Sequence, residues 1–139
     1  MCSSDLILAG ADGVHLPSRG LSPDDARRLV TPGVWLSAAV HDARSVDAAR
    51  GRVDVMLLSP FGAVPDKGPP LETVGFAALR GRAPEACVIA LGGISTAADV
   101  RAALAAGADG IAVRRALLDS PDPATVCAAL AEALPRGGD

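Results

Sequence analysis

The stretch that decides the fold is Cys87–Leu118, CVIALGGISTAADVRAALAAGADGIAVRRALL. Cys87–Leu91 is a short apolar run that ends at two glycines, which favours a buried strand over a helix. A second apolar run, Gly110–Val113, follows about twenty residues later. The stretch therefore predicts two strands, each followed by a loop.

The residues between and after these strands predict helices. A helix is expected over Thr96–Ala106, because Thr96 and Asp99 have the spacing of a capping box. Gly107 can supply the left-handed residue that ends this helix. Ala116–Leu118 can begin another helical turn after the second strand. Each predicted strand thus leads into the N-terminus of a helix.

Two loops in this stretch are candidates for binding an anion. Backbone N–H groups at Gly92, Gly93, Arg114 and Arg115 can point at one anion between two adjacent strands. In (β/α)8 barrels the loops after strands seven and eight often hold a phosphate. Alternatively, the two glycines only form a tight turn. The two arginines would then be one surface residue and one residue at the start of a helix.

Upstream, the same pattern of strand and helix continues. Ser22, Pro23 and Asp25 form a strong helix start, and Asp42 can cap the helix after it. Asp122 with Pro123 begins the last helix. The further strands are expected over Gly13–Leu16, Val34–Ala39 and Val53–Ser59, and the further helices over 22–30, 43–50, 74–81 and from 123 onward. We also expect Trp35 and the cysteines to be buried.

Five strand–helix units at this spacing predict an α/β fold with a parallel sheet. The phrase AGADG(V/I) occurs at Ala9–Val14 and again at Ala106–Ile111, which marks the same helix-to-strand joint twice. Two architectures compete: a doubly wound sheet needs about five units, whereas a (β/α)8 barrel needs eight and at least ~200 residues. The chain has 139 residues, which suits one domain.

Composition excludes several classes of function. The net charge is −3 and only 2% of residues are aromatic, so neither a basic cluster nor a stacking platform for nucleic acid is present. No run approaches the ~18 apolar residues of a membrane span. Three irregularly spaced cysteines suit neither a disulfide framework nor a zinc site. This composition favours the cytoplasm, with no membrane or nucleic-acid partner.

Three side chains are candidates for chemistry. His15 and His41 are the only histidines, and both lie at or just beyond the ends of predicted neighbouring strands, where barrel enzymes keep their catalytic groups. Strands lie ~4.8 Å apart, so the two rings could line one pocket and transfer protons. Lys67 is the single lysine, and it lies in the Pro/Gly-rich loop 60–70, where it could close over a phosphate. A core histidine and a solvated lysine are the alternatives.

The chain resembles the thiamine phosphate synthase/TenI family from Leu8 to about Leu134. The resemblance is carried by a set of motifs whose order and spacing are together fairly specific. These are GADGVHL (10–16), a strand ending in His41, Ser59-Pro60-Phe61, the loop with Lys67, PPL (69–71), ALGGI (90–94) and AGADGIAV (106–113).

The resemblance implies a partial TIM (β/α)8 barrel that corresponds to strands four to eight. Residues 1–7 are then an unpatterned start, interpreted as an artefact, 8–134 the half-barrel domain and 135–139 a tail. We expect the chain to be a truncated piece of the barrel, completed by a homo-oligomer or by the missing N-terminal half-barrel, because an open sheet leaves unpaired strand edges. A chain without such a partner is expected to be unstable or prone to aggregation.

In function, the resemblance implies the coupling of hydroxymethylpyrimidine pyrophosphate to thiazole phosphate, with Mg²⁺ in the complete synthase. Lys67, Gly92, Gly93, Arg114 and Arg115 would bind phosphate or pyrophosphate. The family's Mg-binding Asp in the loop after GVHL is replaced by Pro17-Ser18-Arg19-Gly20, so no metal ligand is predicted.

Two alternatives stay open beside the synthase. One is a metal-free, TenI-type thiazole tautomerase, in which His41 is the acid–base group. The Arg19 that follows Leu16-Pro17-Ser18 is closer to that branch. The other is a non-catalytic domain that binds a phosphate compound.

Overall fold

The computed structural model describes residues 9–65 and 67–135. The predicted start, 1–7, and the tail beyond Pro135 lie outside the described residues. Five strands form one parallel sheet in the order β1-β2-β3-β4-β5. They are β1 (Gly13–Leu16), β2 (Trp35–Val40), β3 (Val55–Leu58), β4 (Cys87–Leu91) and β5 (Gly110–Ala112). Because a doubly wound sheet reverses its strand order, this sequential order confirms the barrel-type arrangement.

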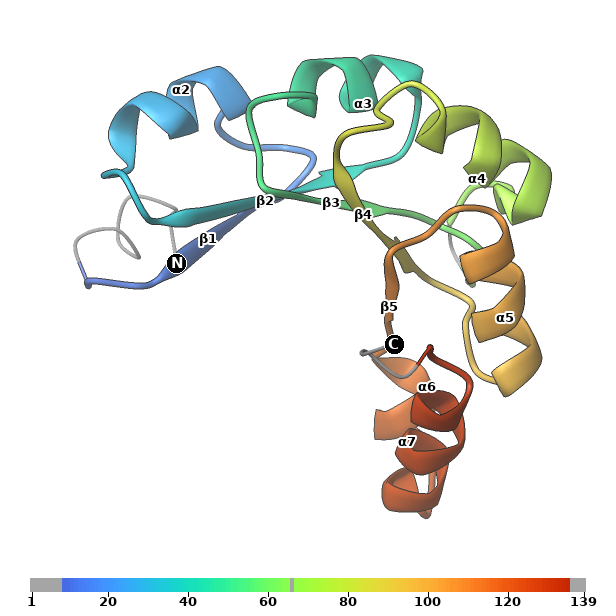
Figure 1. The fold of residues 1–139 in the computed structure, drawn as a ribbon. Coiled ribbons are helices and arrows are strands. Elements are labelled where there is room, and N and C mark those ends of the chain that lie inside the picture. The colour runs from blue at the N-terminus through green and yellow to red at the C-terminus, as the bar shows by residue number, and fades with distance from the viewer. Residues whose placement is uncertain (1–8, 66, 136–139) are drawn as a thin grey trace.

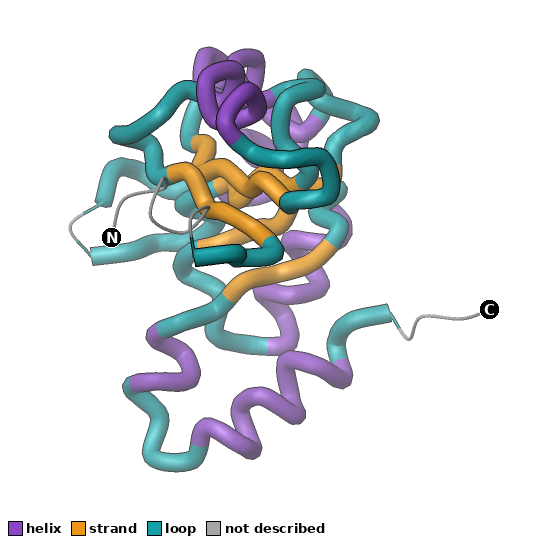
Figure 2. The backbone as a smooth tube through the Cα atoms, turned by 90° about the vertical axis from the view of Figure 1, so that its left-hand side faces the viewer, coloured by secondary structure: helices purple, strands orange, loops and turns teal. Residues whose placement is uncertain are grey.

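The helices alternate with the strands and lie on one side of the sheet. They are α2 (Pro23–Leu29), α3 (Ala43–Ala49), α4 (Glu72–Arg80), α5 (Ala97–Ala105), α6 (Arg115–Leu118) and α7 (Pro123–Glu132). Figure 1 shows α2 to α5 along the convex side of the curved sheet, with α6 and α7 at its C-terminal end. Figure 2 shows how the successive strands turn relative to one another. The described residues therefore form an open arc of strand–helix units.

Short-range capping explains where most helices begin. Ser22, Asp42, Thr96 and Asp122 each accept a hydrogen bond from a backbone N–H in the first turn, as predicted. Helix α4 begins at Glu72, two residues before the predicted start, and no side chain caps it. Its first turn is instead held by backbone hydrogen bonds to the loop after β3, a long-range contact that the sequence pattern does not show.

The core lies between the helices and the convex face of the sheet. Alternate strand residues such as Leu36, Val40, Met56 and Val88 are almost fully buried there. The concave face is less covered by the described residues, and Trp35 on it is 63% exposed. The expectation that Trp35 belongs to the core is therefore wrong, because its strand position points away from the helices. Cys87 and Cys127 are exposed too, contrary to expectation.

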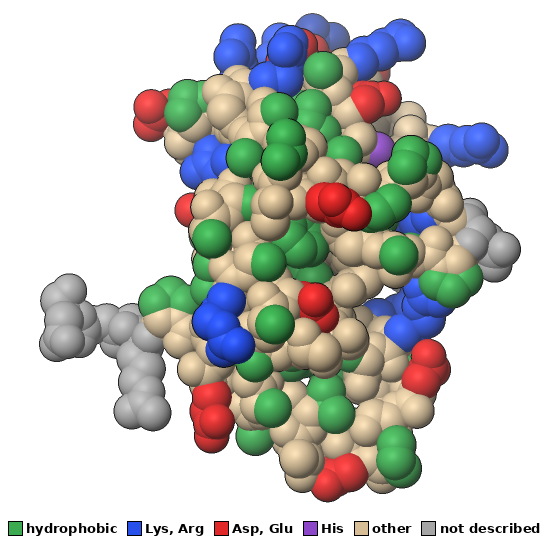
Figure 3. All heavy atoms as spheres, turned by 90° about the vertical axis from the view of Figure 1, so that its right-hand side faces the viewer, with side chains coloured by type: hydrophobic (Ala, Val, Ile, Leu, Met, Phe, Trp, Pro, Cys, Tyr) green, Lys and Arg blue, Asp and Glu red, His purple; other side chains and the backbone are tan. Residues whose placement is uncertain are grey.

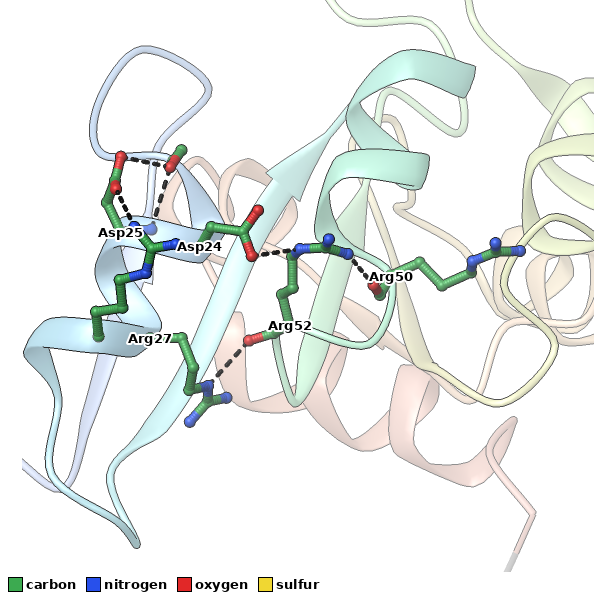
Figure 4. Close-up of polar contacts among 7 residues, drawn as sticks. Asp24, Asp25, Arg27, Arg50 and Arg52 are labelled. Carbon is green, nitrogen blue, oxygen red and sulfur yellow. Dashed lines mark hydrogen bonds and ion pairs between the residues drawn. The ribbon is translucent and has the colours of Figure 1, made fainter.

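No helix among the described residues is long and apolar enough to cross a membrane. On the face of the molecule in Figure 3, acidic side chains lie among basic ones, in keeping with the mixed charge of the sequence. Figure 4 shows one such mixed cluster at α2: Arg52 donates to the Asp24 carboxylate (2.5 Å), and Arg27 donates to the Arg52 carbonyl (3.0 Å). These contacts attach α2 to the turn that precedes β3.

Two aspartates tie neighbouring strands together at their amino ends. Asp54 precedes β3 and accepts the N–H of Leu36 at 2.7 Å, while Asp109 precedes β5 and accepts the N–H of Val88 at 2.7 Å. Arg27 also donates to the Asp54 carboxylate at 2.9 Å. Partial burial raises the pKa of Asp54, but these hydrogen bonds outweigh it, and the net pKa lies below the usual value.

The lowered pKa of Asp54 predicts a loss of stability in acid. Its contribution is complete above the unfolded-state pKa of about 4 and is lost as the pH falls through the lower folded-state pKa. We expect the free energy of unfolding, measured by urea titration, to drop between pH 5 and 3, with less than about 1 kcal/mol of that drop due to Asp54, whose side chain is 37% exposed and therefore screened by solvent.

The variant D54N should make this drop shallower. D119N is the control, because the Asp119 carboxylate accepts no hydrogen bond from the described residues. Identical pH profiles for D54N and D119N would show that the Asp54 contacts contribute nothing measurable.

Candidate functional site

A cavity of about 410 Å³ opens beyond the carboxyl ends of β3, β4 and β5. Its lining combines loop glycines, basic side chains and small apolar groups. The residues are Ser59, Pro60, Ala63, Val64, Pro65, Lys67, Leu91, Gly92, Gly93, Ile94, Ser95, Ala112, Val113, Arg114, Arg115 and Ala116. The structure thus brings together all five residues predicted to bind phosphate: Lys67, Gly92, Gly93, Arg114 and Arg115.

The turn at Gly92 and Gly93, the glycine turn, lines this cavity. Gly92 and Gly93 have φ angles of +93° and +71°, which glycine adopts at no steric cost. The turn packs directly against the loop after β3, where the N–H of Gly62 donates to the carbonyl of Gly92 at 2.9 Å. Within the described part of the chain, the N–H groups of Gly92 and Gly93 donate no hydrogen bond. They are available to an anion in the cavity.

Helix α5 begins directly behind the glycine turn. The Asp99 carboxylate accepts the N–H of Ser95 at 3.0 Å and that of Thr96 at 2.8 Å. Burial raises the pKa of Asp99, but these hydrogen bonds more than offset it, so the pKa is lowered overall. The helix start is therefore fixed by its own carboxylate, and the glycine turn in front of it is left for a ligand.

Three cationic side chains and no carboxylate line the cavity among the described residues. Lys67 comes from the loop between β3 and α4, and Arg114 and Arg115 come from the turn after β5. This set can neutralise a phosphate or pyrophosphate by charge-assisted hydrogen bonds. It does not suit Mg²⁺, which needs oxygen ligands.

A search for clusters of possible metal ligands covered the rest of the described chain as well. The described chain contains no group of three or more His, Cys, Asp or Glu side chains that could hold a metal ion. The Mg²⁺ implied by the family resemblance therefore finds no ligand set in residues 9–65 and 67–135.

His41 lies outside the cavity and bridges three loops. Its Nδ1 is 2.8 Å from the carbonyl oxygen of Ser59 and 3.1 Å from the Ser59 hydroxyl. Its Nε2 is 3.3 Å from the hydroxyl of Ser18. Among the described residues Ser59 is a buried polar residue, 2% exposed, and its contact with His41 is partly buried.

His15 does not share a pocket with His41. His15 pairs in register with Ser37, which lies four residues before His41 on the next strand. The two histidines are therefore roughly 13 Å apart along the strand direction. The Nδ1 of His15 is 2.9 Å from the Ser37 hydroxyl. Partial burial lowers the pKa of His15, which favours the neutral ring. The two histidines thus occupy separate polar sites.

Sequence reasoning missed Ser18 and the bond from His41 to Ser59. One signal was present: His41 and Ser59 come directly after β2 and β3, and Ser18 lies two residues after the end of β1. The carboxyl ends of parallel strands meet at one edge of a sheet, so residues in these positions can meet.

Comparison with known sequences shows which family this chain is similar to. The sequence model of the family described as thiamine monophosphate synthase matches residues 5–117. The thiamine-phosphate synthase of Methanoculleus marisnigri is 43% identical over 119 residues, which are 84% of this chain and 56% of that protein. The thiamine-phosphate synthase of Albidiferax ferrireducens is 39% identical, over 86% of this chain and 56% of that protein. The chain thus spans little more than half the length of these relatives.

Solved structures show the same fold. A thiamine phosphate pyrophosphorylase from Pyrococcus furiosus superimposes with a TM-score of 0.79 at 24% identity, covering 94% of this chain and 63% of that one. An orotidine 5'-phosphate decarboxylase from Pyrococcus horikoshii superimposes with a TM-score of 0.69 at 19% identity, covering 94% and 64%. At these identities the likeness concerns the fold alone.

Proposed function

The chain belongs to the thiamine monophosphate synthase family, and from that premise we propose that its cavity binds the phosphate groups of the two substrates of thiamine phosphate synthesis. The family acts on a small pyrimidine and a small thiazole compound. The observation that carries the proposal is the meeting of Lys67, the glycine turn and the two arginines in one cavity.

In this proposal, each part of the cavity has its own task. The N–H groups of Gly92 and Gly93 hold the phosphate of the thiazole substrate, as fixed donors that need no rearrangement. Lys67, Arg114 and Arg115 stabilise the negative charge that develops on pyrophosphate as its bond to the pyrimidine methylene carbon breaks. The thiazole nitrogen then attacks that carbon and thiamine phosphate forms. Val64 and Pro65, from the loop with Lys67, help to exclude water.

Anion binding is the direct test of the proposal. Titration of the chain with inorganic phosphate and with pyrophosphate, followed by calorimetry, should show saturable binding that weakens as salt is added. Supplying pyrimidine pyrophosphate and thiazole phosphate then tests the coupling reaction. Binding without turnover would leave the non-catalytic, phosphate-binding alternative, and no anion binding at all would rule out the proposed use of the cavity.

Arg115 should contribute strongly to this binding. We expect R115A to weaken pyrophosphate binding about tenfold, because it removes one charge-assisted contact. R101A is a matched control: Arg101 is an exposed arginine of α5 that does not line the cavity. Equal affinities in the two variants would show that only the overall charge of the chain matters.

A second candidate function is proton transfer on a thiazole phosphate by His41. It is favoured by the contacts of His41, whose two ring nitrogens both have a polar partner. The relatives named above are synthases, so this function remains second to phosphate binding and coupling.

A further inference from the structure

Ser18, His41 and Ser59 form a chain of contacts across the ends of three adjacent strands. The Ser18 hydroxyl is 3.3 Å from His41 Nε2, and His41 Nδ1 is 2.8 Å from the Ser59 carbonyl oxygen. Ser18 follows β1, His41 follows β2 and Ser59 follows β3. The parallel sheet itself therefore assembles the chain of contacts.

The Ser59 carbonyl decides which nitrogen of His41 carries the proton. A carbonyl oxygen can only accept a hydrogen bond, so the shorter contact, 2.8 Å to the Ser59 carbonyl, requires a proton on Nδ1, and the Ser59 hydroxyl at 3.1 Å is then a second acceptor. In the neutral ring Nε2 then has a free lone pair, and Ser18 must donate its hydroxyl proton to it. Ser59 is almost fully buried, which limits the access of water to this contact.

We propose that Ser18 and His41 form a proton relay in which His41 Nε2 is the base and the Ser18 hydroxyl is the group that meets the ligand. A proton from a bound acid passes to Ser18 Oγ as the Ser18 proton moves to Nε2. His41 becomes an imidazolium ion that still donates from Nδ1 to Ser59, and the reverse transfer restores the starting state. No metal or redox partner takes part.

This inference rests on the second candidate function, proton transfer, and not on phosphate binding in the cavity. Ser18 is exposed and lies where a ligand can reach it, whereas Ser59 lies inside. His41 contacts a hydroxyl group through one ring nitrogen and an acceptor that orients the ring through the other. This is the arrangement in which a histidine activates a hydroxyl group.

His15 provides a comparison within the same molecule. Its Nδ1 contacts only the Ser37 hydroxyl, at 2.9 Å among the described residues. A hydroxyl can donate or accept, so this contact does not fix the position of the ring proton. Because the sequence has only two histidines, their nitrogen signals can be assigned by comparing single variants.

The first test is nuclear magnetic resonance of the full chain labelled with ¹⁵N. We expect His41 to carry its proton on Nδ1 and to have an unprotonated Nε2. S18A should shift the His41 Nε2 signal and leave the Nδ1 signal in place, while S37A should shift only His15 signals. A proton on Nε2 of neutral His41, or an Nε2 signal that S18A leaves unchanged, would overturn the relay.

The second test is the isomerisation of thiazole carboxylate phosphate. We expect S18A to slow it at least tenfold, S18T to restore most of the rate, and pyrophosphate binding to be the same in all three proteins. An unchanged rate in S18A, or no isomerisation by the wild-type chain, would overturn the proposal. Phosphate binding is measured separately, so the proposed use of the cavity stands or fails on its own result.

Discussion

Gly93→Ala is expected to lower the free energy of unfolding by about 3 kcal/mol or more and to abolish anion binding with it. Gly93 has a φ of +71°, a conformation that costs any residue with a Cβ about 1–2 kcal/mol. A Cβ there would also lie only 2.6 Å from the Cα of Gly62 and closer still to its carbonyl carbon. These are backbone atoms, so the two loops must move apart to admit it.

Gly51→Ala separates the two causes. Gly51 has a φ of +73°, almost the same as that of Gly93, but no atom lies within 4 Å of the Cβ that alanine would add. We expect G51A to cost only the strain of the backbone, about 1 kcal/mol. Urea unfolding followed by circular dichroism measures both variants. If G93A cost no more than G51A, the close approach of Gly62 would have no energetic role.

The close approach matters because it joins two loops of the cavity. The N–H of Phe61 donates to the Leu91 carbonyl at 3.0 Å, one residue before the bond from Gly62 to Gly92. The loop after β3 therefore runs alongside the glycine turn after β4. Moving this loop by the space of a methyl group would displace the wall of the cavity that carries Lys67.

The predictable part of the structure is the part that depends on neighbours in sequence. The caps at Ser22, Asp42 and Thr96 are confirmed, because a capping hydrogen bond joins residues only three apart. The meeting of Gly92 and Arg114 was predictable too, since both follow adjacent parallel strands. In these cases a local rule, or a rule of parallel sheets, is enough.

The parts that could not be predicted depend on contacts distant in sequence. The exposure of Trp35 depends on what covers the concave face, which no local pattern shows. Ser18 meets His41 only because a loop after β1 turns towards β2. The early start of α4 depends on a hydrogen bond from Glu72 N–H to the Phe61 carbonyl at 2.9 Å.

Phe76→Ala is the second change with a large expected effect. Phe76 of α4 is completely buried, and its ring meets that of Phe61 edge to face at a centroid distance of 5.5 Å. Truncation removes a large apolar side chain and leaves a cavity, which costs about 3–5 kcal/mol. Urea unfolding should show this loss, and phosphate affinity should fall as well if folded protein remains.

The fall in affinity is expected because Phe61 belongs to the loop that forms the cavity wall. Phe61 is held on one side by its backbone bond to Leu91 and on the other by the Phe76 ring. Without Phe76, the loop loses this packing contact and depends more on its backbone bonds to the glycine turn. The loss of phosphate affinity would therefore result from a lost packing contact and not from a change of charge.

Leucine in place of either ring tests this account. F76L keeps most of the side-chain volume and should lower the free energy of unfolding by about 1 kcal/mol. A double-mutant cycle of F61L, F76L and the double variant should give an interaction energy of about 1 kcal/mol between the two rings, from their edge-to-face contact. A coupling of zero would mean that the two rings fill space independently.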